Sequence, residues 1–352
     1  MPSTQRNELL ESIALTITDY RQGEITRPNA EHVDRWIRQF ARFGADEPIQ
    51  QTLLFEIDHI LKHTYISKGI VTQFLRELIQ NPRIAMRPDL HGDSLISFWR
   101  SVNFLRLQAP GSSQLALLEI VDRIMQEIFG FQTRDCGQVG GPYLFLDDCL
   151  FSGRRVRRDV IGWLRTNGEL WGELYVVVLG RHRSGGWYTE TEIEKVASDA
   201  LTIVEWLPSY LNVEDRKAYV NLSEVLRPAT VPDDPFVTEY ARSLTVSGYP
   251  PILRKPGWQP RNRIFSSEIG RHPVEQFFLR AGAYLRAQAA YPDEDMRPLG
   301  YSALKTFGFG GLLVTHRNVA NNCPLALWYG DPDAPSYHPF SKWYPLFLPK
   351  RR

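Results

Sequence analysis

The first 80 residues carry apolar side chains at the spacing of amphipathic helices. Apolar positions recur every three or four residues, so that one face of each predicted helix is hydrophobic. The four segments are residues 7–20, 30–43, 48–63 and 68–80. A loop rich in proline and glycine follows at 82–94. The pattern therefore predicts a helical N-terminal region, residues 1–94, and a second domain, residues 95–352.

The hydrophobic pattern changes in the second domain. Short unbroken apolar runs, typical of strands buried on both faces, alternate with longer segments of helical spacing. The predicted order is strand 104–108, helix 115–129, strand 143–146, helix 154–165 and strand 174–179. This alternation predicts an α/β fold in which a parallel sheet has helices on both faces.

The last third of the chain is less regular. Residues 272–290 predict one long helix. The apolar runs 309–315 and 324–328 predict two strands around a polar loop, and residues 343–347 predict a packed aromatic strand.

Composition excludes several classes of protein. The 41 basic and 40 acidic residues give a net charge of +1, which argues against a globally basic nucleic-acid binder but leaves local basic patches open. The three cysteines are few and far apart, so neither a disulfide framework nor a cysteine zinc site is expected. No apolar run reaches the roughly 18 residues of a membrane span. We expect a soluble cytoplasmic protein.

The clearest chemistry lies in residues 143–156, YLFLDDCLFSGRRV. Asp147 and Asp148 end a buried strand, and a short loop then reaches Ser152 and Gly153 at the start of a helix. Ligands of open α/β sheets bind at the carboxyl ends of strands. A glycine loop that opens a helix suits phosphate, and carboxylates can bind sugar hydroxyls or the waters of Mg²⁺. The spacing of these residues favours a site for phosphate, sugar hydroxyls and Mg²⁺. The alternative is an ordinary strand end with two solvated acids, followed by a helix cap.

This segment resembles the signature of phosphoribosyltransferases, in which apolar strand residues precede two acids and a later Ser/Thr-Gly-x-Ser/Thr loop. Asp147, Asp148, Ser152 and Gly153 match it. The resemblance implies that the acids hold the ribose hydroxyls of phosphoribosyl pyrophosphate and Mg²⁺, as catalytic and metal residues. It also implies that residues 152–155, including Arg154 and Arg155, bind the 5′-phosphate. Arg155 replaces the final Ser or Thr; it could pair with phosphate, or the pocket could be altered or lost.

The same resemblance implies a second loop, which contacts pyrophosphate after an earlier strand. The residues in the matching position are Pro110, Gly111, Ser112 and Ser113. All but the proline could donate backbone N–H groups to an anion. An ordinary turn that caps helix 115–129 explains them equally well.

Further polar residues are candidates for binding a second substrate. Arg181 and Arg183 follow the strand 174–179, and the polar C-terminal loop adds donors and acceptors. Its residues are His316, Arg317, Asn321 and Asn322. The alternatives are a solvated loop and an Asn-rich hairpin turn.

A narrower resemblance covers most of the chain. The motifs are WIRQF at 36–40, DDCLFSG at 147–153, NNCPLALW at 321–328 and WYPLF at 343–347. They are similar to the phosphoribosyltransferase-like domain of bacterial conflict and antiphage defence systems (PRTase-CE type), although Phe151 replaces a glycine of that domain. Some members are encoded beside a retron reverse transcriptase and a winged-helix protein and act as toxic effectors.

The resemblance implies an enzyme that acts at ribose C1 of a phosphoribosyl or nucleotide substrate with Mg²⁺. Its implied partners are a winged-helix protein and a reverse transcriptase with its RNA–DNA. No membrane partner is expected, and oligomerisation is left open. Catalysis would rest on positioning and electrostatics around an oxocarbenium-like state. The alternative is a catalytically degenerate fold that binds a nucleotide or scaffolds a defence nucleoprotein complex, which Phe151 and Arg155 favour.

Overall fold

A computed structural model describes the chain except for a few short segments. The described residues are 3–81, 89–167, 172–197, 203–215, 223–255, 257 and 263–350. The chain forms two compact units. Unit 1 comprises Met1–Ser67 and Glu214–Arg352, and unit 2 comprises Lys68–Val213. The sequence-based boundary at 94/95 lies inside unit 2, and residues 82–88 of the predicted loop lie outside the described residues.

Unit 2 is built on a parallel sheet. Its strands are β2 (Asn103–Phe104), β3 (Tyr143–Leu150), β4 (Glu173–His182), β5 (Ile203–Trp206) and β6 (Leu211–Val213). The order is β2-β3-β4-β5, and β6 pairs in parallel with the carboxyl end of β4. The predicted strand–helix alternation and the α/β class are confirmed.

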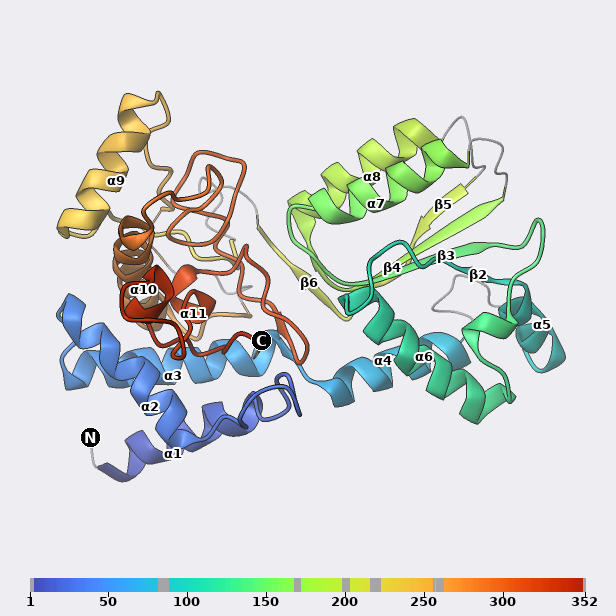
Figure 1. The fold of residues 1–352 in the computed structure, drawn as a ribbon, viewed down its shortest axis with the longest axis horizontal. Coiled ribbons are helices and arrows are strands. Elements are labelled where there is room, and N and C mark those ends of the chain that lie inside the picture. The colour runs from blue at the N-terminus through green and yellow to red at the C-terminus, as the bar shows by residue number, and fades with distance from the viewer. Residues whose placement is uncertain are drawn as a thin grey trace. The chain divides into compact units, whose positions relative to one another are not determined.

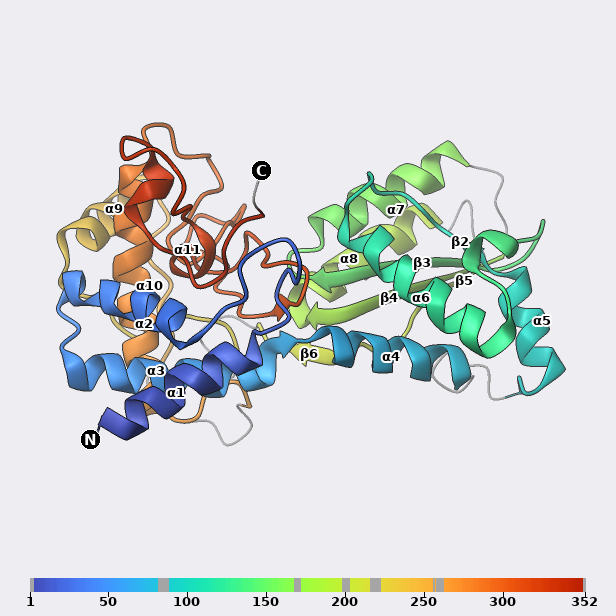
Figure 2. The ribbon, with the colours of Figure 1, turned by 60° about the horizontal axis from the view of Figure 1, so that its bottom comes forward.

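Helices cover both faces of this sheet. They are α4 (Lys68–Gln80), α5 (Asp93–Ser101), α6 (Ser113–Phe129), α7 (Arg154–Thr166) and α8 (Arg183–Ala197), with a 3₁₀ turn η2 (Thr133–Asp135). α6 packs on β3 and α4. α7 and α8 lie side by side on the opposite face (Figures 1 and 2). Phe145, Val160 and Val176 are among the buried residues that join sheet and helices. The helix α5 was not predicted.

Unit 1 is mainly helical. Its elements are α1 (Ser3–Thr16), α2 (Ala30–Arg38), η1 (Gln39–Phe43), α3 (Glu47–Thr64), β1 (Tyr65–Ile66), α9 (Pro235–Val246), α10 (Glu268–Gln288), β7 (Val314–Thr315), α11 (Leu325–Trp328) and η4 (Pro339–Lys342). The predicted N-terminal helices and the long helix near 272–290 are confirmed. α3 packs on α10 and α4 packs on α6, which explains why the compact units divide the chain after Ser67.

The predicted C-terminal strands are wrong. Residues 325–328 form the helical turn α11, only Val314 and Thr315 of the run 309–315 form a strand, and residues 343–347 form none. The backbone carbonyl of Ala326 accepts hydrogen bonds from the indoles of Trp36 (2.9 Å) and Trp343 (2.8 Å). Short apolar runs in strands and in buried helical turns cannot be distinguished by periodicity, and tertiary packing decides here.

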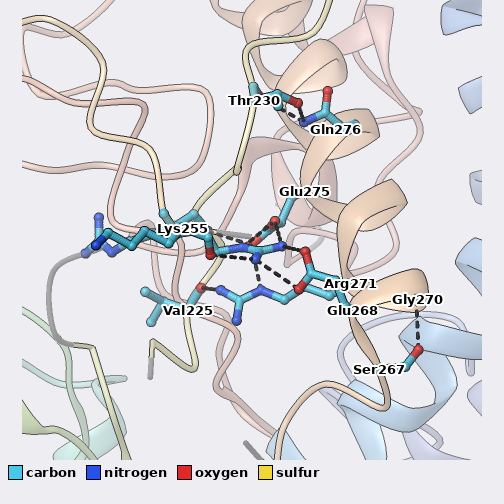
Figure 3. A network of polar contacts seen from close by, with 11 residues as sticks. Val225, Thr230, Lys255, Ser267, Glu268, Gly270, Arg271, Glu275 and Gln276 are labelled. Atoms are coloured by element: carbon cyan, nitrogen blue, oxygen red, sulfur yellow. Dashed lines mark hydrogen bonds and ion pairs between the residues drawn. The ribbon is translucent and has the colours of Figure 1, made fainter. Parts of the chain in front are cut away.

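A buried ionic network lies along α10. The guanidinium of Arg254 donates to both carboxylate oxygens of Glu275 and to both of Glu268. Arg271 donates to Glu275 at 2.7 Å and to the carbonyl of Val225 at 3.1 Å. Figure 3 shows Glu268, Arg271 and Glu275 projecting from the helix into this network. Buried charges require such partners, so the network ties the 223–255 segment to α10.

Among the described residues, no helix has the length and apolar character needed to cross a membrane.

Candidate functional site

Two loops leave the carboxyl edge of the unit 2 sheet and diverge. The β2–α6 loop leads to a helix on one face, and the β3–α7 loop leads to a helix on the other (Figures 1 and 2). In open α/β sheets, ligands bind where neighbouring connections separate in this way. The acid pair and both predicted phosphate loops belong to this edge, between β2 and β3.

Asp147 lies buried in the carboxyl-terminal half of β3, with 1% of its surface exposed. The prediction that the two acids end the strand is wrong, because the pairing of β3 with β4 continues through Leu150. Its Oδ2 accepts a hydrogen bond from the side-chain amide of Gln108 at 2.9 Å. Its Oδ1 accepts bonds from the Ser113 hydroxyl (3.2 Å) and the backbone N–H of Asp148 (2.9 Å). The structure thus brings one acid into contact with the predicted pyrophosphate loop.

The protein environment raises the pKa of both acids. Burial, followed by the neighbouring charge of Asp148, raises the pKa of Asp147 to about 7. Burial also raises the pKa of Asp148, whereas the Arg155 guanidinium lowers the pKa of both acids. A carboxyl with a pKa near the working pH can act as a general acid or base.

The loop at 105–113 is held to the strand by a glutamine. The buried side chain of Gln114 accepts hydrogen bonds from the backbone N–H groups of Leu107 (2.8 Å) and Gln108 (3.0 Å), and donates to the carbonyl of Leu146 at 3.2 Å. Ser112 caps α6 through the N–H of Leu115. The loop therefore caps a helix, as one interpretation expected, and it also contacts Asp147; its binding of pyrophosphate stays a prediction. Gln108 and Gln114 were not predicted; their position one βα loop before the acids was the only available signal.

Pro110 and Gly111 are exposed at the tip of the same loop. Gly111 has a φ of +84°, a left-handed conformation that glycine adopts without strain.

The Ser152–Gly153 loop opens α7 as predicted. Gly153 is the N-cap residue, has a φ of +71° and lacks a side chain that could cap the helix. A Cβ on Gly153 would clash with the Thr189 hydroxyl, so the loop packs tightly against α8. Ser152, Arg154 and Arg155 are exposed beside the first backbone N–H groups of α7. This arrangement suits a phosphate group.

Phe151 is buried and stacks on the His182 ring, with 4.5 Å between ring centroids. Phe151, which replaces a glycine of the resembled domain, therefore anchors this loop.

The two arginines after β4 differ in their surroundings. Arg181 pairs with Glu190 at 2.6 Å and lies 5.3 Å from the centre of the Trp206 ring, which are structural roles. Arg183 begins α8 and is exposed.

The C-terminal candidates belong to unit 1 and have partners there. Arg317 pairs with Glu24 at 2.6 Å, and the Asn322 amide donates to the carbonyl of Tyr301 at 2.8 Å. Backbone bonds join the His316 N–H to Ile66 and the Asn321 carbonyl to the N–H of Tyr301. Their binding of a second substrate stays a prediction.

The acid pair has the donor chemistry that Mg²⁺ requires. In the part of the chain that the structure describes, no group of three or more His, Cys, Asp or Glu side chains is placed to hold a metal. Mg²⁺ usually binds one or two carboxylates together with waters and substrate phosphates. Two adjacent carboxylates with raised pKa values, one buried and one half-buried, fit that mode, because a bound cation would favour their charged forms.

No curated protein and no solved structure matches the chain. One family model, PRTase-CE, matches residues 33–348. The matched range includes parts of both compact units, with the acid pair and the two tryptophans that donate to the carbonyl of Ala326. The chain therefore belongs to the PRTase-CE family.

Proposed function

We propose that the protein is a phosphoribosyltransferase-like enzyme that makes or breaks a bond at ribose C1 of a phosphoribosyl or nucleotide substrate. The observation that carries this proposal is the pair Asp147–Asp148 in the carboxyl-terminal half of β3, where Asp147 is buried and Asp148 half-buried, between two loops suited to anions. Membership of the PRTase-CE family supports it.

In this proposal each group of residues binds a different part of the substrate. Asp147 and Asp148 accept hydrogen bonds from the ribose hydroxyls, and the N–H groups at the start of α7 with Arg155 bind the 5′-phosphate. The loop 110–113 faces the leaving group. The acid pair would also hold Mg²⁺, whose charge would offset that of a leaving pyrophosphate. The side chains act by positioning charge around an oxocarbenium-like state, so no covalent nucleophile is required.

We further propose that this chemistry serves as the toxic effector of a bacterial antiphage system of the retron type, with a reverse transcriptase, its RNA–DNA and a winged-helix protein as partners. The proposal rests on the family, whose model covers most of the chain.

A second candidate function is binding without catalysis. Phe151 is packed where the resembled family has glycine, and Arg155 stands where it has Ser or Thr. A loop anchored in this way could bind a nucleotide without turning it over.

The test is the double variant Asp147→Asn with Asp148→Asn, alongside the exposed control Glu119→Gln on α6. Metabolites are profiled after expression, and binding of phosphoribosyl pyrophosphate and common nucleotides is measured by calorimetry with and without Mg²⁺. The enzyme proposal predicts that the double variant loses both cellular toxicity and nucleotide turnover, whereas the control keeps them. Toxicity that persists in the double variant would remove the proposal. Ligand binding without turnover in the unmodified protein would favour the second candidate.

A further inference from the structure

The first turns of α7 and α8 form a basic and aromatic surface at the carboxyl edge of the sheet. The segments 154–159 and 183–188 together contain five arginines and one acid. The whole chain carries a net charge of only +1, so this concentration is local. Cations are unfavourable at helix N-termini, at a cost of a few tenths of a kcal/mol or more each. Helix stability therefore does not explain these arginines.

Two large rings are exposed in the same place. Trp187 is 65% exposed and Tyr188 is 46% exposed. Within the described ranges, no aromatic ring packs on Trp187. Exposed rings of this size at a basic surface are typical of a binding platform rather than of packing.

Arg157 connects this surface to the Ser152–Gly153 loop. Its guanidinium donates to the carbonyl of Ser152 at 2.9 Å and lies 4.5 Å from the centre of the Tyr188 ring. The Tyr188 ring is therefore oriented by the arginine that also braces the loop. Glycine allows this proximity, because a Cβ on Gly185 would clash with the carbonyl of Phe151.

The remaining arginines of this surface are exposed to solvent. Arg154, Arg155, Arg158 and Arg183 are exposed. Arg158 is paired with Asp159 at 2.8 Å, and Arg155 makes no hydrogen bond or ion pair with the described residues. Glutamates appear only further along α8, where Glu192 pairs with Lys195. The first turns that bear the rings therefore hold five arginines, whereas the last turns of α7 and α8 hold one basic residue each, Arg165 and Lys195.

We infer that this surface, Arg154–Asp159 with Arg183–Tyr188, binds single-stranded nucleic acid. Alternating phosphates and bases match guanidinium groups beside exposed rings, and stacking on aromatic side chains requires unpaired bases. A duplex offers phosphates but hides its ring faces, and an acidic peptide would match the arginines but leave the rings without partners. The Ser152–Gly153 loop adjoins the surface, so a strand held there would present a nucleotide to it.

Fluorescence anisotropy with a labelled 12-nucleotide single strand tests this inference without any turnover. Trp187→Ala and Tyr188→Ala are each expected to weaken binding by roughly 5- to 100-fold, the range for loss of one stacked base. Tyr188→Phe should retain most of the affinity, because it keeps the ring. Tyr291→Ala, which removes a ring that is 97% exposed in unit 1, should have no effect.

Salt dependence tests the arginines separately. Replacing Arg154, Arg155 and Arg158 by glutamine should reduce the slope of log affinity against log salt by about 2, at about 0.7 per phosphate of a single strand. Arg134→Gln, an exposed arginine elsewhere in unit 2, should leave the slope unchanged.

Equal affinity for a duplex of the same length, or full binding by the Trp187→Ala/Tyr188→Ala double variant, would overturn the inference. A different variant tests the proposed function, so the two proposals can fail independently. Asp147→Asn with Asp148→Asn should abolish turnover yet keep oligonucleotide affinity within about twofold. Melting temperatures confirm that each variant is folded.

Discussion

The side-chain amide of Gln108 donates a hydrogen bond to Oδ2 of Asp147 across 2.9 Å. This bond joins the β2–α6 loop to the acid pair of β3, and it lowers the pKa of Asp147 against the larger effect of burial. Gln108, which precedes the predicted pyrophosphate residues on the same loop, thus lowers the pKa of an acid predicted to bind ribose. The other amide atom of Gln108, Oε1, is buried and has no hydrogen-bond partner among the described residues.

Gln108→Leu removes the donor and should raise the pKa of Asp147 above its present value of about 7. Hydrogen bonds to charged groups contribute about 1.5–3 kcal/mol, so Mg²⁺-dependent ligand affinity at pH 7 should fall by about tenfold or more. Carboxyl ¹³C NMR titration measures the pKa directly. Gln126→Leu, at an exposed position of α6, is the control. An unchanged titration midpoint for Asp147 would contradict the role of Gln108.

Asp147 should make the protein less stable as the pH rises. Its pKa is raised from 3.8 in the unfolded chain to about 7 in the folded one. The folded state therefore retains the proton more strongly, and the stability that this provides is lost as the pH rises from about 4 through 7.

Asp147→Asn should flatten the pH dependence and raise the free energy of unfolding at pH 8 by on the order of a few kcal/mol. The Gln108 amide can rotate so that Oε1 accepts from the new amide. Urea denaturation of both proteins at pH 5 and pH 8 tests this prediction. A difference between the two proteins that is the same at both pH values would rule out the buried acid as its cause.

Gly153→Ala should destabilise unit 2 and disturb the phosphate loop. The backbone is left-handed there, and the added Cβ meets the Thr189 hydroxyl. We expect a loss of about 1–3 kcal/mol. Gly162→Ala lies in the same helix, exposed and with open space around it, and should instead stabilise by up to about 1 kcal/mol. Thermal unfolding distinguishes the two. A lower melting temperature for Gly153→Ala with a higher one for Gly162→Ala supports the packing explanation. Equal shifts in the two variants argue against it.

Glu275→Gln should strongly destabilise unit 1. The Glu275 carboxylate is fully buried and accepts hydrogen bonds from Arg254 and Arg271. Its neutralisation leaves two buried guanidinium groups with the single carboxylate of Glu268, which bonds Arg254 alone among the described residues. Breaking a buried ion pair typically costs about 3–5 kcal/mol.

Glu239→Gln is the matched control, because it breaks an ion pair with Arg242 in which both side chains are about two-thirds exposed. Its effect should stay below about 1 kcal/mol. Guanidinium unfolding curves followed by tryptophan fluorescence measure both variants. A similar loss in the two proteins would mean that burial does not govern the strength of these pairs.

The secondary structure around the site followed from local patterns. Helical and strand periodicities, together with the turn at Ser152–Gly153, predicted β3, α7, β4 and α6 in the right order. The prediction was wrong at residues 324–328, where the run is too short for its periodicity to distinguish a strand from a helical turn. A sequence motif also does not show whether its residues bind a ligand or pack in the core. Trp36 and Trp343 belong to motifs of the family resemblance, yet both indoles donate hydrogen bonds to the carbonyl of Ala326 inside unit 1.

The sequence by itself determined the α/β class, the link between Asp147, Asp148 and a buried strand, and the glycine that opens α7, because these depend on residues close together in the chain. The continuation of β3 through Leu150, beyond the acids, depends on its pairing with β4. Tertiary structure alone decided the burial that raises the pKa of Asp147 and its contacts with Gln108 and Ser113. It also decided the pairing of Arg181 with Glu190 and the packing of Tyr188 near Ser152 through Arg157. Burial, charge and packing of these groups arise from segments brought together across the sheet and between helices, and periodicity along the chain carries no record of those distances.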